Sequence, residues 1–131
     1  MKPFSPPLTT DALLERRFVH TTLAATRIWR SARDNGTPPQ PRLFAGLEPW
    51  GLGLLAPAFD SVLRLAEIAL GRRFGVGVLG RPSPDERWLL TAASAPAVAY
   101  PAWPDVRTED LRRPLAAGFA SLRWLYRTAV D

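Results

Sequence analysis

The stretch PAFDSVLRLAEIALGRRF, residues 57–74, carries the strongest helical signal in the chain. Pro57 suits the first turn of a helix, where its missing N–H leaves no hydrogen bond unmade. Apolar side chains then cover well over half of the helical circumference, at Phe59, Val62, Leu63, Leu65, Ala66, Ala69 and Leu70. A helix that is apolar on most sides is typical of the centre of a domain. We therefore expect an all-α fold with about four main helices, the others packing around residues 57–74.

A narrow polar strip runs along the same predicted helix, at Asp60, Arg64, Glu67 and Gly71. Asp60 and Arg64 are four residues apart, a spacing that lets opposite charges pair on one helix face. We expect Asp60 and Glu67 to form pairs of this intrahelical kind.

A long helix is predicted before this segment, beginning at Thr10 or Asp11 and ending near Asn35-Gly36. Its apolar side recurs at three- and four-residue steps, at Leu14, Phe18, Thr21, Ala25, Ile28, Trp29 and Ala32. Its opposite side is basic, and we expect it to face solvent, at Arg16, His20, Arg27 and Arg30.

The connection over residues 37–57 is rich in proline and glycine. A short helical turn around Leu43–Leu47 is expected there and nothing longer, because prolines interrupt the segment. Trp50 and Leu52 make it too apolar for a solvated linker, so we expect it to pack over the core.

Ser83-Pro84-Asp85-Glu86 is the clearest local signal. Serine at the N-cap, proline in the first turn and glutamate three residues after the serine form a capping box. A short helix should follow and end before Pro96, after which residues 96–107 read as an irregular connection.

The last helix should begin at Thr108-Glu109-Asp110 and be kinked at Pro114. Its buried side is expected to comprise Leu111, Leu115, Phe119, Leu122, Tyr126 and Ala129. Residues 1–9 read as an extended, proline-rich lead, and residues 10–131 read as a single helical domain.

Composition narrows the chemistry that the chain can perform. It has 131 residues, no cysteine, one histidine and a net charge of +5, and arginine supplies 16 of its 17 basic residues. Without cysteine there is no thiolate nucleophile and no zinc site of the Cys/His kind. The prolines near the N-terminus predict no secretory leader, and no apolar run reaches the length of a membrane span. We therefore expect a cytoplasmic protein without a metal or cofactor.

Two features could suggest catalysis or nucleotide binding. Residues 75–80 match G-x-G-x-x-G, but a helix precedes them and the acidic Asp85 and Glu86 follow. That context lacks the strand and the anion-binding helix start that the nucleotide motif needs, so we favour a glycine-rich turn with a short extended piece over 74–79. His20 lies among arginines and far from any orienting carboxylate, which favours a solvent-facing, non-catalytic histidine.

The basic helix faces are the most promising functional feature. If the first and last helices pack side by side, one basic surface results, made of Arg16, Arg27, Arg30, Arg113, Arg123, Trp124 and Arg127. Five tryptophans in a short chain favour a protein partner or self-association, because tryptophan and arginine are enriched at interfaces. Nucleic acid, held by counterion release, is the alternative. An enzyme or a carrier of a small ligand is the third hypothesis. For the basic faces themselves, the alternative is a solvated surface that reflects arginine-rich codon usage.

Three segments carry a resemblance to other proteins: the Arg16-Arg17 pair in the long first helix, the apolar helix over Ala58–Leu70, and the helix start Ser83–Leu90. With these, residues 14–95 resemble small uncharacterised helical proteins of GC-rich alphaproteobacteria. The resemblance implies a helical fold and no particular activity, so the expected function remains that of a non-enzymatic binding protein.

Overall fold

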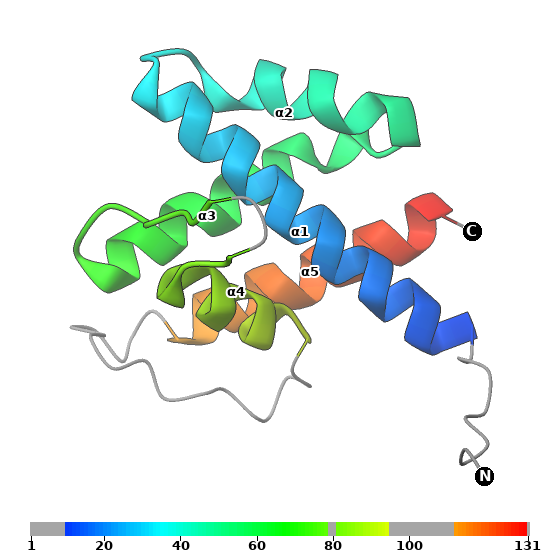
Figure 1. Cartoon of the computed structure of the whole chain (residues 1–131). Coiled ribbons are helices and arrows are strands. Elements are labelled where there is room, and N and C mark those ends of the chain that lie inside the picture. The colour runs from blue at the N-terminus through cyan, green and yellow to red at the C-terminus, as the bar shows by residue number, and fades with distance from the viewer. Residues whose placement is uncertain (1–9, 79–80, 95–111, 131) are drawn as a thin grey trace, which may run out of the picture.

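The computed structural model describes residues 10–78, 81–94 and 112–130, and within these ranges it is helical with no β-strand (Figure 1). The all-α prediction is therefore confirmed. The described α-helices are α1 (Thr10–Asp34), α2 (Pro39–Leu47), α3 (Ala56–Leu70), α4 (Pro84–Ser94) and α5 (Arg112–Val130). Two 3₁₀ turns, η1 (Glu48–Trp50) and η2 (Gly53–Leu55), link α2 to α3.

Helix α1 crosses the whole molecule and packs against each of the other four helices (Figure 1). Phe18 and Trp29 are its largest buried side chains, and Phe18 lies 5.3 Å from Tyr126 of α5, measured between ring centroids. The helix stops where predicted, because Gly36 takes a positive φ of 68° that ends the helical path. Since α1 contacts every other helix, it shares the centre of the fold with α3.

Helix α3 confirms the apolar segment as part of the core. It packs against α1, α2 and α5, and Phe59, Val62, Leu63 and Leu70 are buried. The helix ends at Gly71, whose φ of 67° lets its amide bond back to the Glu67 and Ile68 carbonyls.

Helix α2 is longer than the single turn that the prolines suggested, and that expectation was wrong. Pro39 and Pro41 lie in its first turn, where backbone amides have no intrahelical acceptor, so neither proline removes a bond. Leu43 and Leu47 are buried, and a Cβ on Gly46 would meet Ile28 of α1 at 2.6 Å. The segment thus packs over the core as expected, but as a helix in close contact with α1.

The capping box of α4 forms as predicted. Glu86 N donates to Ser83 Oγ at 3.0 Å, and Ser83 N donates to Glu86 Oε1 at 3.0 Å. Helix α4 packs against α1 and α5, with Trp88 in edge contact with Phe119.

Helix α5 buries Leu115, Phe119, Leu122 and Tyr126 as predicted, whereas Ala129 is exposed. The expected start at Thr108 and the predicted buried Leu111 lie outside the described residues. Pro114 lies in the first described turn of α5, and the kink there stays a prediction. The lead over residues 1–9 and the connection over residues 96–107 also lie outside the described residues.

Candidate functional site

Arg30 does not face solvent, which corrects the predicted basic face of α1. Arg30 is only 5% exposed, and its guanidinium donates hydrogen bonds to Asp34 Oδ1 at 2.6 Å and to Glu67 Oε2 at 3.1 Å. The prediction assumed one buried and one solvated side, but α3 and α4 also cover α1. Arg30 therefore joins α1 to α3 and is not available to a partner.

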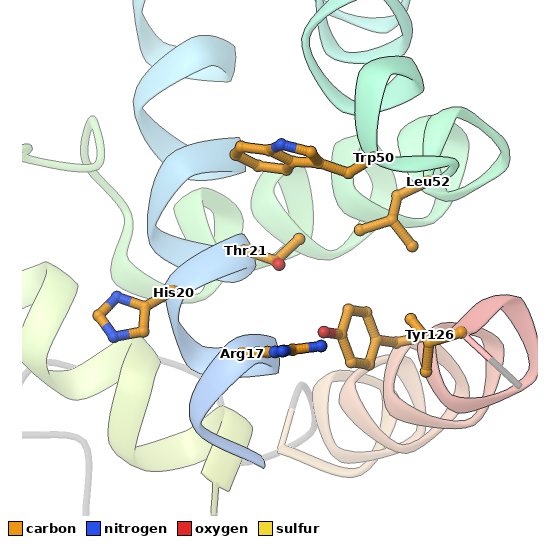
Figure 2. Close-up of a pocket in the computed structure, with 7 residues that line it drawn as sticks. Arg17, His20, Thr21, Trp50, Leu52 and Tyr126 are labelled. Atoms are coloured by element: carbon orange, nitrogen blue, oxygen red, sulfur yellow. The ribbon is translucent and has the colours of Figure 1, made fainter. Parts of the chain in front are cut away.

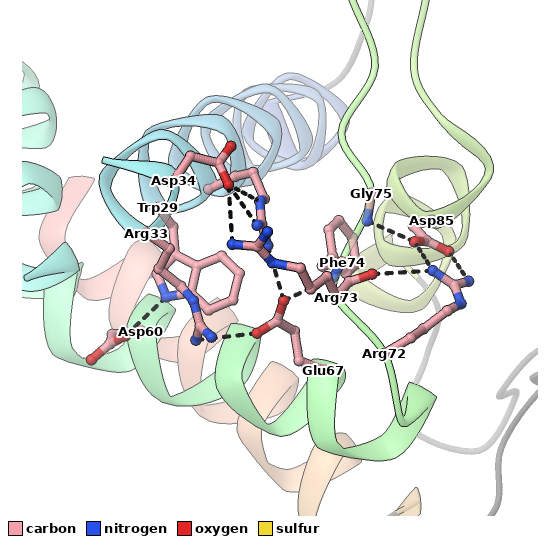
Figure 3. A network of polar contacts seen from close by, with 11 residues as sticks. Trp29, Arg33, Asp34, Asp60, Glu67, Arg72, Arg73, Phe74, Gly75 and Asp85 are labelled. Carbon is pink, nitrogen blue, oxygen red and sulfur yellow. Dashed lines mark hydrogen bonds and ion pairs between the residues drawn. The ribbon is translucent and has the colours of Figure 1, made fainter. Parts of the chain in front are cut away.

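Glu67 was expected to pair within α3, and the structure corrects this as well. Its carboxylate accepts hydrogen bonds from Arg30 of α1 and from the Phe74 amide, the latter at 2.8 Å, and it forms an ion pair with Arg33 of α1 at 3.1 Å (Figure 3). The Asp60–Arg64 pair, by contrast, forms within α3 as predicted, at 2.8 Å.

Arg27 is also engaged by the fold, again contrary to the predicted solvent-facing side. Its Nε lies 3.0 Å from Glu86 Oε2, and the Glu86 side chain has no solvent exposure. Arg27 keeps 28% of its side chain exposed, so it is a partly covered contact between α1 and α4.

The glycine-rich segment is held by the acidic residues that follow it. Gly77 N donates to Glu86 Oε1 at 2.6 Å, and Gly75 N donates to Asp85 Oδ2 at 2.8 Å. Arg72 completes the arrangement with two bonds to Asp85, at 2.6 and 2.7 Å (Figure 3). The amides that a phosphate would need are therefore bound to carboxylates of the same chain, as a structural turn requires.

These contacts keep both carboxylates ionised. Hydrogen bonds from Arg72 lower the pKa of Asp85, aided by the Gly75 amide and opposed by burial. Burial alone would raise the pKa of Glu86, but hydrogen bonds from Arg27 and from the Ser83 and Gly77 amides outweigh it and lower that pKa.

The other predicted surface residues lie elsewhere. Arg123 and Arg127 of α5 both approach Glu15 of α1, with N–O distances of 3.6 and 3.3 Å. Arg16 and Arg113 are exposed. Arg123 and Arg127 thus meet at Glu15, while Arg27 and Arg30 belong to contacts of α1 with α4 and α3.

One side of α5 remains open, and we call it the outer face of α5. Trp124 on this face is 66% exposed. Because a helix turns 100° and rises about 1.5 Å per residue, Arg113 and Trp124 share a face about 16 Å apart. A shallow hollow beside Trp124 is lined by Ala120, Ser121 and Leu125. The outer face comprises Arg113, Ala117, Ala120, Ser121, Trp124 and Arg127, all exposed.

A separate cavity of about 460 Å³ lies where α1, η1 and α5 meet, and we call it the α1–η1–α5 pocket (Figure 2). Beside this pocket, α1 and α5 contact each other through the rings of Phe18 and Tyr126. Its described lining residues are Arg17, His20, Thr21, Trp50, Leu52, Tyr126 and Val130.

The polar groups of this pocket are hydrogen-bond donors. Figure 2 shows Arg17 and the Tyr126 hydroxyl pointing toward one another, with Thr21 one helical turn above Arg17. The His20 ring projects to the other side of α1, as expected for a solvent-facing histidine (Figure 2). Among the described lining residues there is no carboxylate and no thiol, so the arrangement is suited to binding an anion.

The sequence pointed to parts of this pocket without assembling it. Arg17 and Thr21 are one turn apart, and Trp50 lies in a segment too apolar to be a linker. Tyr126 was placed in the buried side of its helix, where it does lie, at 3% exposure. Only the folded chain places these four residues, which come from α1, η1 and α5, around one cavity.

No protein-family model, curated protein or solved structure matches the chain. Within the described ranges, no helix is long and apolar enough to cross a membrane. No cluster of three potential metal ligands occurs in those ranges either.

Proposed function

We propose that this is a small non-enzymatic protein that binds a protein partner through the outer face of α5. One observation carries the proposal: Trp124 is 66% exposed on a face whose ends carry the exposed Arg113 and Arg127. Large exposed aromatic side chains and arginines are the residues in which binding energy concentrates at protein interfaces.

The chemistry of the outer face indicates the kind of partner. Between the two arginines it presents Ala117 and Ala120, which are small and leave room for another helix to approach. A complementary partner is an amphipathic segment with an apolar centre and carboxylates toward its ends. The net charge of +5 favours an acidic segment of this kind.

Nucleic acid is the weaker alternative. Arg27 and Arg30 pair with Glu86, Asp34 and Glu67, so they add no charge to a phosphate-binding surface. Arg123 keeps only 23% of its side chain exposed beside Glu15, which leaves Arg113 and Arg127 as the open arginines of α5, too few for an extended phosphate backbone.

A non-enzymatic role in the cytoplasm is part of the proposal. It is supported by the absence of cysteine, by the lack of a carboxylate beside His20 among the described lining residues of the pocket, and by the use of Asp85 and Glu86 as structural acceptors.

The test uses a phage-displayed library of random peptides selected on the folded chain. Enriched peptides should combine acidic residues with a large apolar residue, and synthetic copies should bind at least about tenfold more weakly to Trp124→Ala. Phe44→Ala, an exposed aromatic residue on α2, is the matched control and should bind like the wild type.

Three outcomes would contradict the proposal. The first is equal binding of the selected peptides to Trp124→Ala and to the wild type. The second is a selection that yields no binding peptide. The third is micromolar binding of duplex DNA near about 150 mM salt that is lost in the double variant Arg113→Glu, Arg127→Glu. That result would favour nucleic acid as the partner. Sedimentation of the free chain distinguishes self-association from a foreign partner.

A further inference from the structure

We infer that the α1–η1–α5 pocket binds a small monocarboxylate with a flat apolar body, such as an aromatic or arylalkyl acid. This site lies apart from the outer face of α5, and the inference does not depend on the proposed protein partner.

The dimensions and walls of the pocket fit a small organic molecule. Its volume of about 460 Å³ lies within the range of known ligand sites. Leu52 and Tyr126 are each 3% exposed and form apolar surface inside it, while the Trp50 indole stands opposite Tyr126 (Figure 2). Trp50 is 64% exposed, so a flat ligand beneath its ring would remove a large apolar surface from water.

The donors of the pocket define the charged end of the ligand. Thr21 is 6% exposed and Tyr126 is 3% exposed, yet neither hydroxyl has a hydrogen-bond partner within the described ranges. Neither hydroxyl oxygen is among the fully buried unpaired atoms of the described ranges, so both open onto the cavity, where they can donate to an acceptor on a ligand. The Tyr126 hydroxyl points toward the guanidinium of Arg17, and Thr21 lies one helical turn above Arg17 on the same helix (Figure 2).

Charge complementarity selects a carboxylate. Arg17 is exposed and makes no ion pair with any described carboxylate, and its planar guanidinium matches the two oxygens of a carboxylate. One guanidinium balances one negative charge. Neutral and cationic ligands would leave this cation without a counter-charge.

The experiment is calorimetric titration of the full chain with phenylbutyrate and naphthylacetate, each compared with its neutral amide. We expect saturable binding with a Kd of about 0.1–1 mM for at least one acid, which is the affinity that so few ligand atoms support. The matching amide should bind at least about tenfold more weakly, because it lacks the charge that Arg17 pairs with.

Variants assign the binding to this pocket. Arg17→Gln and Tyr126→Phe should each weaken the acid by about tenfold or more, and Tyr126→Phe keeps the ring that packs on Phe18. Trp50→Ala should weaken acid and amide alike. Arg42→Gln and Phe44→Ala, both exposed on α2, are the matched controls and should bind like the wild type. Circular dichroism and thermal midpoints confirm that each variant is folded.

Any of three results would overturn the inference: no saturable binding of either acid up to about 10 mM, equal affinity for an acid and its amide, or unchanged affinity in Arg17→Gln. Because Trp124 and Arg113 have no part in this assay, its failure leaves the proposed function of α5 standing, and the reverse also holds.

Discussion

The indole nitrogen of Trp29 donates a hydrogen bond to Asp60 Oδ1 at 2.9 Å, and both residues are buried. The same carboxylate accepts from Gln40 of α2 at 3.0 Å and from Arg64 of α3 at 2.8 Å. Asp60 therefore connects three helices. Burial would raise its pKa, but the hydrogen bonds from Arg64, Gln40 and Trp29 outweigh burial and hold that pKa below the ordinary value.

Replacing Asp60 by alanine should lower the free energy of unfolding by about 2–3 kcal/mol, because it strands the buried Trp29 N–H. Arg64→Ala should cost less than about 1 kcal/mol, since Arg64 is exposed and Asp60 keeps its hydrogen bonds from Trp29 and Gln40. Urea unfolding measures both. Equal losses, or additive effects of Asp60→Ala and Trp29→Phe in a double-mutant cycle, would show that the Trp29–Asp60 bond is not the cause.

Acid should destabilise the fold through Asp60, Asp85 and Glu86. Their pKa values are lower in the folded chain than the ordinary 3.8 for aspartate and 4.5 for glutamate, so folding favours the ionised forms. This stabilisation is fully present above the ordinary values and is lost as the pH falls through the lower, folded ones. Unfolding free energy measured at a series of pH values should be nearly flat above about pH 5.5 and should decline below about pH 4.5.

Glu86→Gln should shrink that decline and also destabilise the fold at neutral pH. Both Glu86 oxygens accept from donors, so a glutamine NH₂ group would face a donor in either orientation. Glu48→Gln, at an exposed carboxylate on η1, is the control and should reproduce the wild-type curve. If the pH dependence of stability were unchanged in Glu86→Gln, ionised Glu86 would not be one of the groups that stabilise the fold.

Gly77→Ala should destabilise the chain by about 1–3 kcal/mol, the usual range for overpacking. A Cβ there would collide with the Arg81 carbonyl oxygen and lie 2.7 Å from the Ser83 amide nitrogen, both backbone atoms. Gly75→Ala meets only the Asp85 carboxylate, at 3.2 Å, and should cost less. The thermal unfolding midpoints of the two variants test this difference. Equal midpoints would mean that the backbone of the turn shifts at little cost to accommodate a Cβ at Gly77.

Leu63→Ala and Leu70→Ala should each cost about 2–5 kcal/mol, because both side chains are buried. Ile68→Ala on the same helix should cost under about 0.5 kcal/mol, because Ile68 is 64% exposed. The denaturant midpoints of the three variants test this prediction. Similar losses of stability at all three sites would mean that the buried side of α3 is assigned wrongly.

The sequence predicted those elements whose signals are local. Hydrophobic periodicity placed α1, α3 and α5, and the Ser83–Glu86 pattern placed the start of α4. It misjudged α2, because Pro39 and Pro41 read as breakers until their first-turn position is known.

The hydrophobic pattern of the sequence could not predict the polar contacts between helices. Periodicity separates an apolar side from a polar side, but it does not reveal that α3 and α4 cover the polar side of α1. Arg27 and Arg30 were consequently expected in solvent, and their partners Glu86 and Glu67 come from distant parts of the chain. The α1–η1–α5 pocket was missed for the same reason, since three separate segments form it.

The binding of Gly75 and Gly77 amides by Asp85 and Glu86 has a consequence for local motion. These amides lie outside any helix, where exchange with deuterium is ordinarily fast, yet both are tied to carboxylates at the start of α4. The turn and α4 should therefore open together as one cooperative unit. The two glycine amides should exchange at rates set by the opening of that unit.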